Sequence, residues 1–205
     1  NESIRLLPLM EETKKRHPQL IERTEYLAGD KGYDAADTHI TLWEEHQIKG
    51  IIDTREMWKD EKGSSRPLYS DRADTIVYTE KGEVLCRFQD TSTEEENYAP
   101  LAFEGFEADR LTLKYRCPAA AKGIACTQRD FCNGGCHPAW GRIVRIPLDT
   151  DRRIFTPVAR CTPKWEREYD HRTAVERVNS RIDNVFGFEH HYIRGHKKMQ
   201  VRMSL

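Results

Sequence analysis

The sequence predicts an α/β fold that is interrupted by a β-rich insertion. Amphipathic helical patterns and short apolar strand patterns alternate over residues 1–54, which is typical of a mostly parallel sheet covered by helices. Strand and turn patterns then dominate to about residue 163, and a long helical pattern follows. With 205 residues, the chain is long enough for one domain and a sizeable insertion.

The first 54 residues contain two helices and two short strands in alternation. Apolar residues spaced for one helical face begin the first helix, and Pro18 ends it. Each predicted strand is a short apolar run, and the first one ends at Gly29 and Asp30. In order, we expect a helix at 6–16, a strand at 25–28, a helix at 35–46 and a strand at 51–52.

The insertion is predicted to be built mainly of strands. Residues 60–66 are charged and contain Gly and Ser, which favours a loop, and residues 91–97 form a polar, acidic connector. Strands at 75–79 and 83–89 flank a Glu-Lys-Gly turn and predict a hairpin. Further strands are expected at 111–115 and 142–146, and a helix runs from about 165 to 186.

Composition and charge exclude some classes of protein. Lys and Arg number 33 against 34 Asp and Glu, so the net charge of −1 excludes a supercharged nucleic-acid tail. Apolar runs stay far below the ~20 residues that span a bilayer, so we expect no membrane partner. Residues 140–205 carry 14 basic against 8 acidic residues, a net +6. That imbalance indicates either a polyanion partner or a solvated helix surface.

Asp30 is the first candidate site residue. It follows a buried strand, and α/β proteins place their ligands at this end of the strands. Gly29 and Gly32 on either side permit tight turns and a close approach of a phosphate or a metal ion. The alternative is structural, because Asp30, Asp34 and Asp37 could each cap a helix.

The last predicted helix has three distinct faces at ~100° per residue. We expect the apolar stripe to be core, whereas the polar stripe places a carboxylate one turn after an arginine. The alternative for that pair is an ordinary i,i+4 ion pair on a solvated surface. The apolar stripe consists of Val175, Val178, Ile182, Val185 and Phe186. The polar stripe consists of Tyr169, Arg172, Glu176, Asn179 and Asp183, and the third, basic face of Arg177, Arg181 and Asn184.

Two of these motifs resemble the DDE transposases of bacterial insertion sequences. They are the string Asp30-Lys31-Gly32-Tyr33-Asp34 and the series Tyr169, Arg172 and Glu176 in YDHRTAVERVNSRI. The cysteine-containing segment followed by GRIVRIPLD and RRIFTPVAR resembles one branch of that group. The resemblance implies an RNase H-like core in which two aspartates and one glutamate hold two divalent ions, and it assigns Asp30 and Glu176 to that set. It also implies that the first aspartate and the opening strands lie upstream of residue 1.

The resemblance implies metal-dependent cleavage and strand transfer of DNA by an in-line displacement at phosphorus, with Mg²⁺ or Mn²⁺ as cofactor. Tyr169 and Arg172 would contact the DNA backbone or orient Glu176, and Arg177 and Arg181 would contact phosphates. Asp183 stands where the family often has a lysine, which departs from the family pattern.

The same resemblance implies an organisation, partners and a location. Residues 1–54 would be the first part of the RNase H-like core, residues 55–163 the insertion, and residues 164–205 the last helix and a basic tail. The partners would be transposon-end and target DNA and, in the active state, further copies of the chain. The location would be the bacterial cytoplasm, at the nucleoid.

Four of the six cysteines lie close together in the insertion. Cys117, Cys126, Cys132 and Cys136 fall within 20 residues, and soft ligands so placed could hold a tetrahedral Zn²⁺. The alternative is that all four are reduced free thiols. Cys86 and Cys161 are expected to be separate, small apolar residues.

Two other functions remain open from the sequence. The first is a non-catalytic, transposase-derived DNA-binding remnant, which would keep the basic helix but lack the first catalytic aspartate. The second is a zinc-binding interaction module unrelated to DNA, which would leave the paired motifs around Asp30 and Glu176 unexplained.

Overall fold

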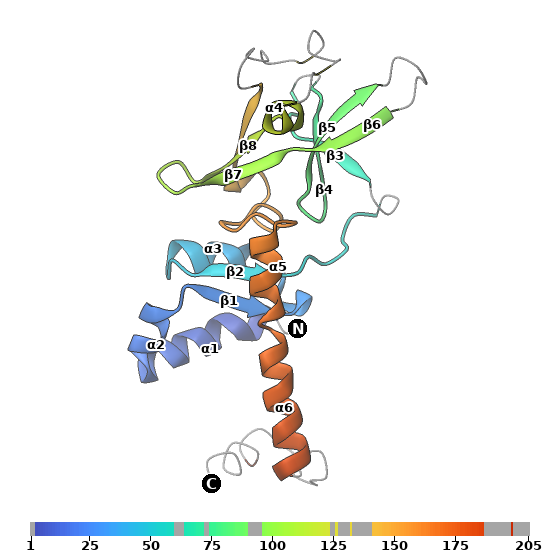
Figure 1. Cartoon of the computed structure of the whole chain (residues 1–205). Coiled ribbons are helices and arrows are strands. Elements are labelled where there is room, and N and C mark those ends of the chain that lie inside the picture. The colour runs from blue at the N-terminus through green and yellow to red at the C-terminus, as the bar shows by residue number, and fades with distance from the viewer. Residues whose placement is uncertain are drawn as a thin grey trace. The chain divides into compact units, whose positions relative to one another are not determined.

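The computed structural model describes residues 3–59, 64–71, 74–89, 96–123, 126, 132, 141–186 and 198. It is a mixed α/β structure with several sheets and helices (Figure 1). The chain divides into two compact units, Asn1–Tyr169 and Asp170–Leu205. The segment boundaries expected at residues 54 and 163 remain predictions.

The first part of the larger unit contains a parallel strand pair. Strand β1 (Tyr26–Gly29) runs parallel to β2 (Lys49–Ile52), with α3 (Ala36–Glu44) between them in the chain, as the sequence predicts. Helix α1 (Ser3–Arg16) packs on this part, because its Met10 is buried in one cluster with Leu42, Ile48 and Ile52. The short helices α2 (Pro18–Arg23) and η1 (Lys31–Tyr33) were not predicted.

Two antiparallel sheets form the β-rich part of the same unit (Figure 1). The first has the order β3 (Ser65–Pro67), β4 (Ile76–Thr79), β5 (Val84–Gln89), β6 (Glu96–Pro100), and the second β7 (Ala102–Glu107), β8 (Thr112–Arg116), β9 (Ile143–Pro147). A short helix, α4 (Pro118–Lys122), follows β8, and η3 (Leu148–Thr150) follows β9. The parallel pairing expected within residues 1–54 is confirmed at β1 and β2, and the antiparallel sheets lie in the segment for which strands and a hairpin were expected.

The loop and connector predictions also need correction within this part. Ser65 and Arg66, expected in a loop, belong to β3, and Glu96 and Asn97, expected in a connector, begin β6. Both are edge strands of their sheet, where pairing with a single neighbour tolerates polar sequence. The predicted hairpin is confirmed as β4 and β5.

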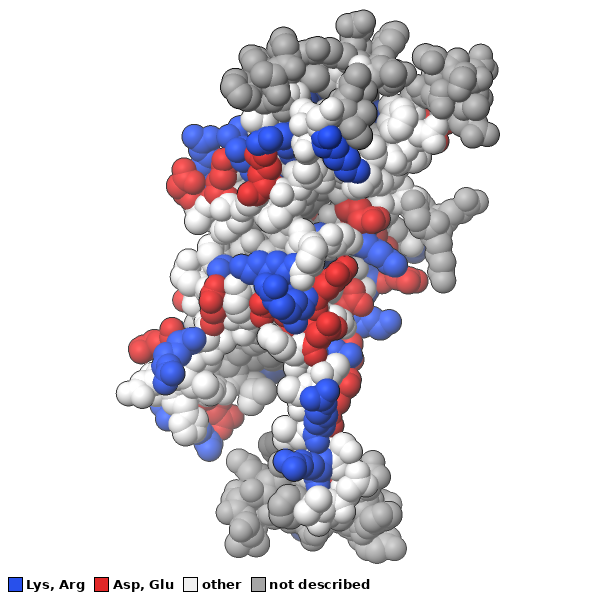
Figure 2. Space-filling model, in the orientation of Figure 1, with Lys and Arg blue, Asp and Glu red and all other residues white. Residues whose placement is uncertain are grey.

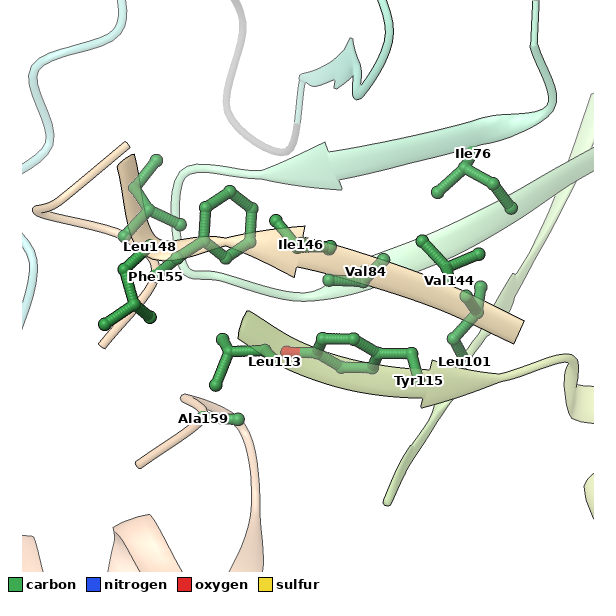
Figure 3. Packing of buried hydrophobic residues seen from close by; sticks show 11 residues of the cluster. Ile76, Val84, Leu101, Leu113, Tyr115, Val144, Ile146, Leu148, Phe155 and Ala159 are labelled. Atoms are coloured by element: carbon green, nitrogen blue, oxygen red, sulfur yellow. The ribbon is translucent and has the colours of Figure 1, made fainter. Parts of the chain in front are cut away.

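The main hydrophobic core joins the two antiparallel sheets. Figure 3 shows its side chains meeting between the strands, with Ile76 and Val84 from the first sheet and Leu113, Tyr115 and Ile146 from the second. Leu148, Phe155 and Ala159 from the chain after β9 complete it. Trp43 of α3 packs edge-on against Phe106 of β7, with ring centroids 5.3 Å apart, which connects the β-rich part to the parallel pair.

The long C-terminal helix is interrupted, which overturns part of the expectation. Helix α5 (Pro163–Asp170) ends before α6 (Thr173–Phe186) begins, and the Thr173 hydroxyl donates to the Asp170 carbonyl at the break. Such side-chain to backbone bonds compete with helical ones. The expected apolar stripe is not a core face either, because Val175, Val178 and Val185 on α6 are each more than half exposed.

Within the part of the chain that the structure describes, no helix combines the length and the apolar character that a membrane crossing requires.

Candidate functional site

Two aspartates occupy equivalent positions at the carboxyl edge of the parallel pair. Gly29, the last residue of β1, lies opposite Ile52, the last residue of β2. Asp30 follows Gly29 and Asp53 follows Ile52 in the sequence. Because neighbouring strands are ~4.8 Å apart, these two aspartates lie side by side where the strands end. Ligands of α/β proteins bind at this edge. Asp53 was not predicted as a site residue, although it also comes directly after a short apolar strand.

Asp30 has a local structural role as well as an exposed position. It is the N-cap residue of η1, and its Oδ1 accepts the backbone N–H of Lys31 at 2.7 Å. The capping alternative is therefore realised at Asp30. A carboxylate has about four acceptor sites on its two oxygens. The cap consequently fixes the orientation of Asp30 and still leaves acceptor capacity for another partner.

A cleft of about 730 Å³ opens beside this edge. Its walls come from the loop after β2, the β4–β5 turn and the beginning of α5, and acidic side chains outnumber basic ones. Carboxylate oxygens are the protein ligands that Mg²⁺ and Mn²⁺ prefer, so the lining is suited to divalent cations. The charged lining residues are Lys31, Asp53, Glu56, Glu80, Lys81, Glu83, Arg160 and Glu166, with Trp58, Tyr98 and Trp165 among the others.

Asp34 lies at the centre of a buried charge network beneath the cleft. Its side chain is fully buried, and its Oδ2 accepts the Arg55 backbone N–H at 2.8 Å and the Arg153 guanidinium at 3.0 Å. Burial by itself would raise the pKa of Asp34, but His39, the Arg55 amide, Arg153 and Arg160 together hold that pKa below its ordinary value. The alternative that Asp34 is a helix N-cap is wrong, because Ala35 is the N-cap of α3, and Asp34 is instead the C-cap residue of η1.

Arg153 joins three separate segments of the chain through this network. Besides Asp34, its guanidinium contacts the Arg55 carbonyl at 3.1 Å and the Glu80 carboxylate at 3.1 Å. Glu80 follows β4 and accepts the backbone N–H of Met57 at 2.6 Å. The β4–β5 turn is therefore fastened to the loop that follows Asp53, which fixes two walls of the cleft.

Arg160 holds the end of β2 in place. Its guanidinium donates to the carbonyl of Ile52, and to the carbonyls of Arg153 at 2.8 Å and Ile154 at 3.3 Å. Burial lowers the pKa of Arg160 to about 10, although Asp34 and Asp53 favour its charged form. Arg160 is therefore still a cation at neutral pH, and it lines the cleft next to Asp53.

His39 is a neutral member of the same network. It is 5% exposed, and its Nε2 lies 3.6 Å from Asp34 Oδ1, which is longer than a hydrogen bond. Burial lowers the pKa of His39, and Arg160 and Arg153 lower it further, whereas Asp34 opposes them. The imidazole is consequently uncharged at neutral pH.

The second unit carries Glu176, Arg177 and Arg181 on α6, and Arg172 in the turn directly before it. Glu176 is half exposed and accepts Arg172 Nη1 at 2.6 Å, so the ion pair predicted from the i,i+4 spacing is formed. Arg177 and Arg181 are exposed, one helical turn apart. Tyr169 belongs instead to α5, where its ring stacks on Trp165 at 4.9 Å. Because Asp30 and Glu176 belong to different units, their shared metal site remains a prediction.

The cysteine cluster is only partly described. Cys117, Cys126 and Cys132 form no disulfide among the described residues, Cys136 lies outside those residues, and Cys132 Sγ is 4.0 Å from Arg142 Nη1. Burial raises the pKa of Cys86 to about 11, and the charges of those three cysteines raise it further. Among the described residues, the group of three candidate metal ligands whose atoms lie within 4.8 Å of one another is Glu11, Glu45 and His46, and it includes none of these sulfurs. Zinc binding here remains a prediction.

Searches of protein families, curated proteins and solved structures found no match to this chain. Its function must therefore be inferred from the residues of the site itself.

Proposed function

We propose that this chain is part of a DDE-type transposase, with an RNase H-like core that supports metal-dependent cleavage and strand transfer of DNA. The observation that carries the proposal is the carboxyl edge of the β1–β2 pair. Asp30 and Asp53 leave that edge side by side, next to a cleft with a mainly acidic lining. Carboxylates that can hold divalent ions are the protein groups that this chemistry needs.

The donor set fits the proposed cofactor. Asp30, Asp53 and Glu176 offer oxygen ligands only, which suits Mg²⁺ or Mn²⁺ better than softer metals. Bound at these carboxylates, the ions would stabilise charge on the attacking and leaving oxygens of an in-line displacement. Asp30 would hold its carboxylate at the sheet edge through its cap, and Arg172 would orient Glu176 through their ion pair.

The proposed DNA contacts depend on individual cations of α6 rather than on a broad field. Figure 2 shows basic and acidic side chains interleaved over the visible face of the described residues. Arg177 and Arg181 stand one turn apart on α6, where two guanidinium groups could follow successive phosphates. Tyr169 and Arg172 would add backbone contacts. Transposon-end DNA, target DNA and further copies of the chain are the partners in this proposal.

A plasmid-nicking assay with a parallel DNA-binding assay tests the proposal. In a protein that also supplies the first catalytic aspartate, we expect nicking of supercoiled DNA in Mg²⁺ or Mn²⁺ that EDTA abolishes, and loss of nicking in Asp30→Asn and in Glu176→Gln. DNA affinity should persist or rise in Glu176→Gln, because the substitution removes a negative charge near the phosphates. Asp37→Asn changes an exposed aspartate on α3 and should nick like the unmodified chain.

The same assay separates the main alternative. A non-catalytic DNA-binding remnant would bind DNA with a strong salt dependence and leave the plasmid intact in both metals. Nicking that is unchanged in Asp30→Asn and Glu176→Gln would contradict the roles that we assign to these two carboxylates.

A further inference from the structure

Three side chains of the types that bind metal ions meet where α1 packs against the end of α3, outside the cleft. Glu11 lies on α1, Glu45 is the C-cap of α3, and His46 is the next residue. One ligand atom from each lies within 4.8 Å of the other two. Both carboxylates are exposed, whereas the His46 side chain is 3% exposed and directs its Nε2 at Glu11 Oε1, 3.7 Å away.

The backbone around these residues holds the group together. Gln47 adopts the left-handed conformation with φ 56°, and its N–H donates to the Trp43 carbonyl at 3.0 Å, which closes the end of α3 directly after His46. On the other side, Met10 is buried beside Leu42 and thereby fixes the turn of α1 that carries Glu11. Helix packing therefore positions Glu11, and the hydrogen-bonded turn at the end of α3 positions Glu45 and His46.

An imidazole and two carboxylates form a ligand set for a divalent transition metal. Mg²⁺ and Ca²⁺ prefer all-oxygen sites, whereas an imidazole nitrogen beside carboxylates suits Zn²⁺. Ligand atoms bonded to one Zn²⁺ at 2.0–2.2 Å are about 3.3 Å apart in tetrahedral geometry, close to the 3.7 Å between Glu11 and His46. The 3.7 Å separation exceeds a hydrogen bond, so an ion would replace a weak contact with bonds.

We propose that Glu11, Glu45 and His46 bind one Zn²⁺ ion, with water as the fourth ligand, and that the ion fastens α1 to the end of α3. Two carboxylates held this close repel each other, and a dication between them removes that repulsion. The site stabilises the packing of α1 and α3 beside the β1–β2 pair and takes no part in the DNA chemistry. It is also separate from the cysteine cluster, so the chain would bind this ion whether or not the cysteines bind another.

Zinc stoichiometry and thermal stability test the site in the whole chain. Equilibrium dialysis should show one Zn²⁺ equivalent fewer in Glu11→Gln and in Glu45→Gln than in the unmodified chain, or at least tenfold weaker binding of that equivalent. The increase in Tm on adding Zn²⁺ should shrink in both variants, because an ion that binds the folded state stabilises it by mass action.

Glu12→Gln is the matched control, since Glu12 is adjacent on α1 but pairs with Arg16. It should bind as many equivalents as the unmodified chain. The cysteine cluster cannot mimic this result, because its contribution is the same in all variants. Equal stoichiometry and affinity in the unmodified chain, Glu11→Gln and Glu45→Gln would overturn the proposal.

Discussion

Replacing Asp34 with asparagine should strongly destabilise the larger unit. The carboxylate is fully buried, 3.0 Å from Arg153 and 4.0 Å from Arg160. Asparagine has nearly the same shape, so the substitution removes the charge without opening a cavity. Its amide oxygen can still accept the Arg55 N–H, and Arg153 keeps its ion pair with Glu80, but the buried Arg160 guanidinium then loses the carboxylate 4.0 Å away.

The expected loss follows from that uncompensated charge. Breaking one partner of a buried ion pair costs about 3–5 kcal/mol, because the remaining charge stays desolvated. A domain of this size has a total stability of about 5–15 kcal/mol, so the loss is a large part of it. At about 2–4 °C per kcal/mol for a domain of 150–250 residues, Tm should fall by roughly 6–20 °C.

Urea denaturation followed by tryptophan fluorescence measures this change. Asp37→Asn is the matched control, because Asp37 is exposed in the first turn of α3 and should lose at most about 1 kcal/mol. A loss below about 1 kcal/mol in Asp34→Asn, at unchanged m-value, would refute the view that this carboxylate neutralises the buried arginines.

Three further predictions concern DNA binding, pH and backbone strain. Filter binding measures the slope of log affinity against log salt concentration, and its magnitude should decrease by ~0.9 in Arg177→Gln and likewise in Arg181→Gln. Unchanged slopes would exclude phosphate contacts by these two arginines. Because the folded-state pKa of His39 is lowered below 6.5, stability should be constant above about pH 6.5. Below about pH 6.5 the free energy of unfolding should fall by up to about 1.4 kcal/mol per pH unit. In His39→Gln, urea titrations should show a weaker dependence of this free energy on pH. Gly82→Ala places a Cβ 3.0 Å from the Arg160 side chain at φ +85°, so the free energy of unfolding should fall by about 1–3 kcal/mol. Gly123→Ala should cost less in the same urea titration, because its Cβ would meet no atom within 4 Å at φ +67°.

Local patterns were enough to predict the parallel pair and the hairpin. The apolar run before Gly29 and the alternation on both sides of the Glu80–Gly82 turn depend on residues that are neighbours in the sequence. Strand β7 was missed because its sequence, AFEGFE, contains Gly105 at a register shift against β8. A glycine there weakens the strand pattern, and only pairing with β8 reveals it.

The buried network could not be predicted for a different reason. Arg153 and Asp34 are 119 positions apart, and Arg153 and Glu80 are 73 apart, so no local pattern connects them. Asp53 could have been predicted as a site residue from the sequence, because it follows β2 directly, as Asp30 follows β1. Periodicity also misassigned Tyr169, since a smooth helical pattern does not register the break between α5 and α6.

Iron-mediated backbone cleavage in the DNA-bound chain tests the central claim most directly. With added H₂O₂ and ascorbate, Fe²⁺ bound in place of Mg²⁺ reduces the peroxide to hydroxide and a hydroxyl radical, which cuts the chain near the ion, and fragment masses locate the cuts. If Asp30 and Glu176 share one metal site, cuts should appear near both residues, and Asp30→Asn should remove both sets together. Cuts near only one of them, or cuts near Glu176 that persist in Asp30→Asn, would contradict the shared site and the proposed DDE chemistry.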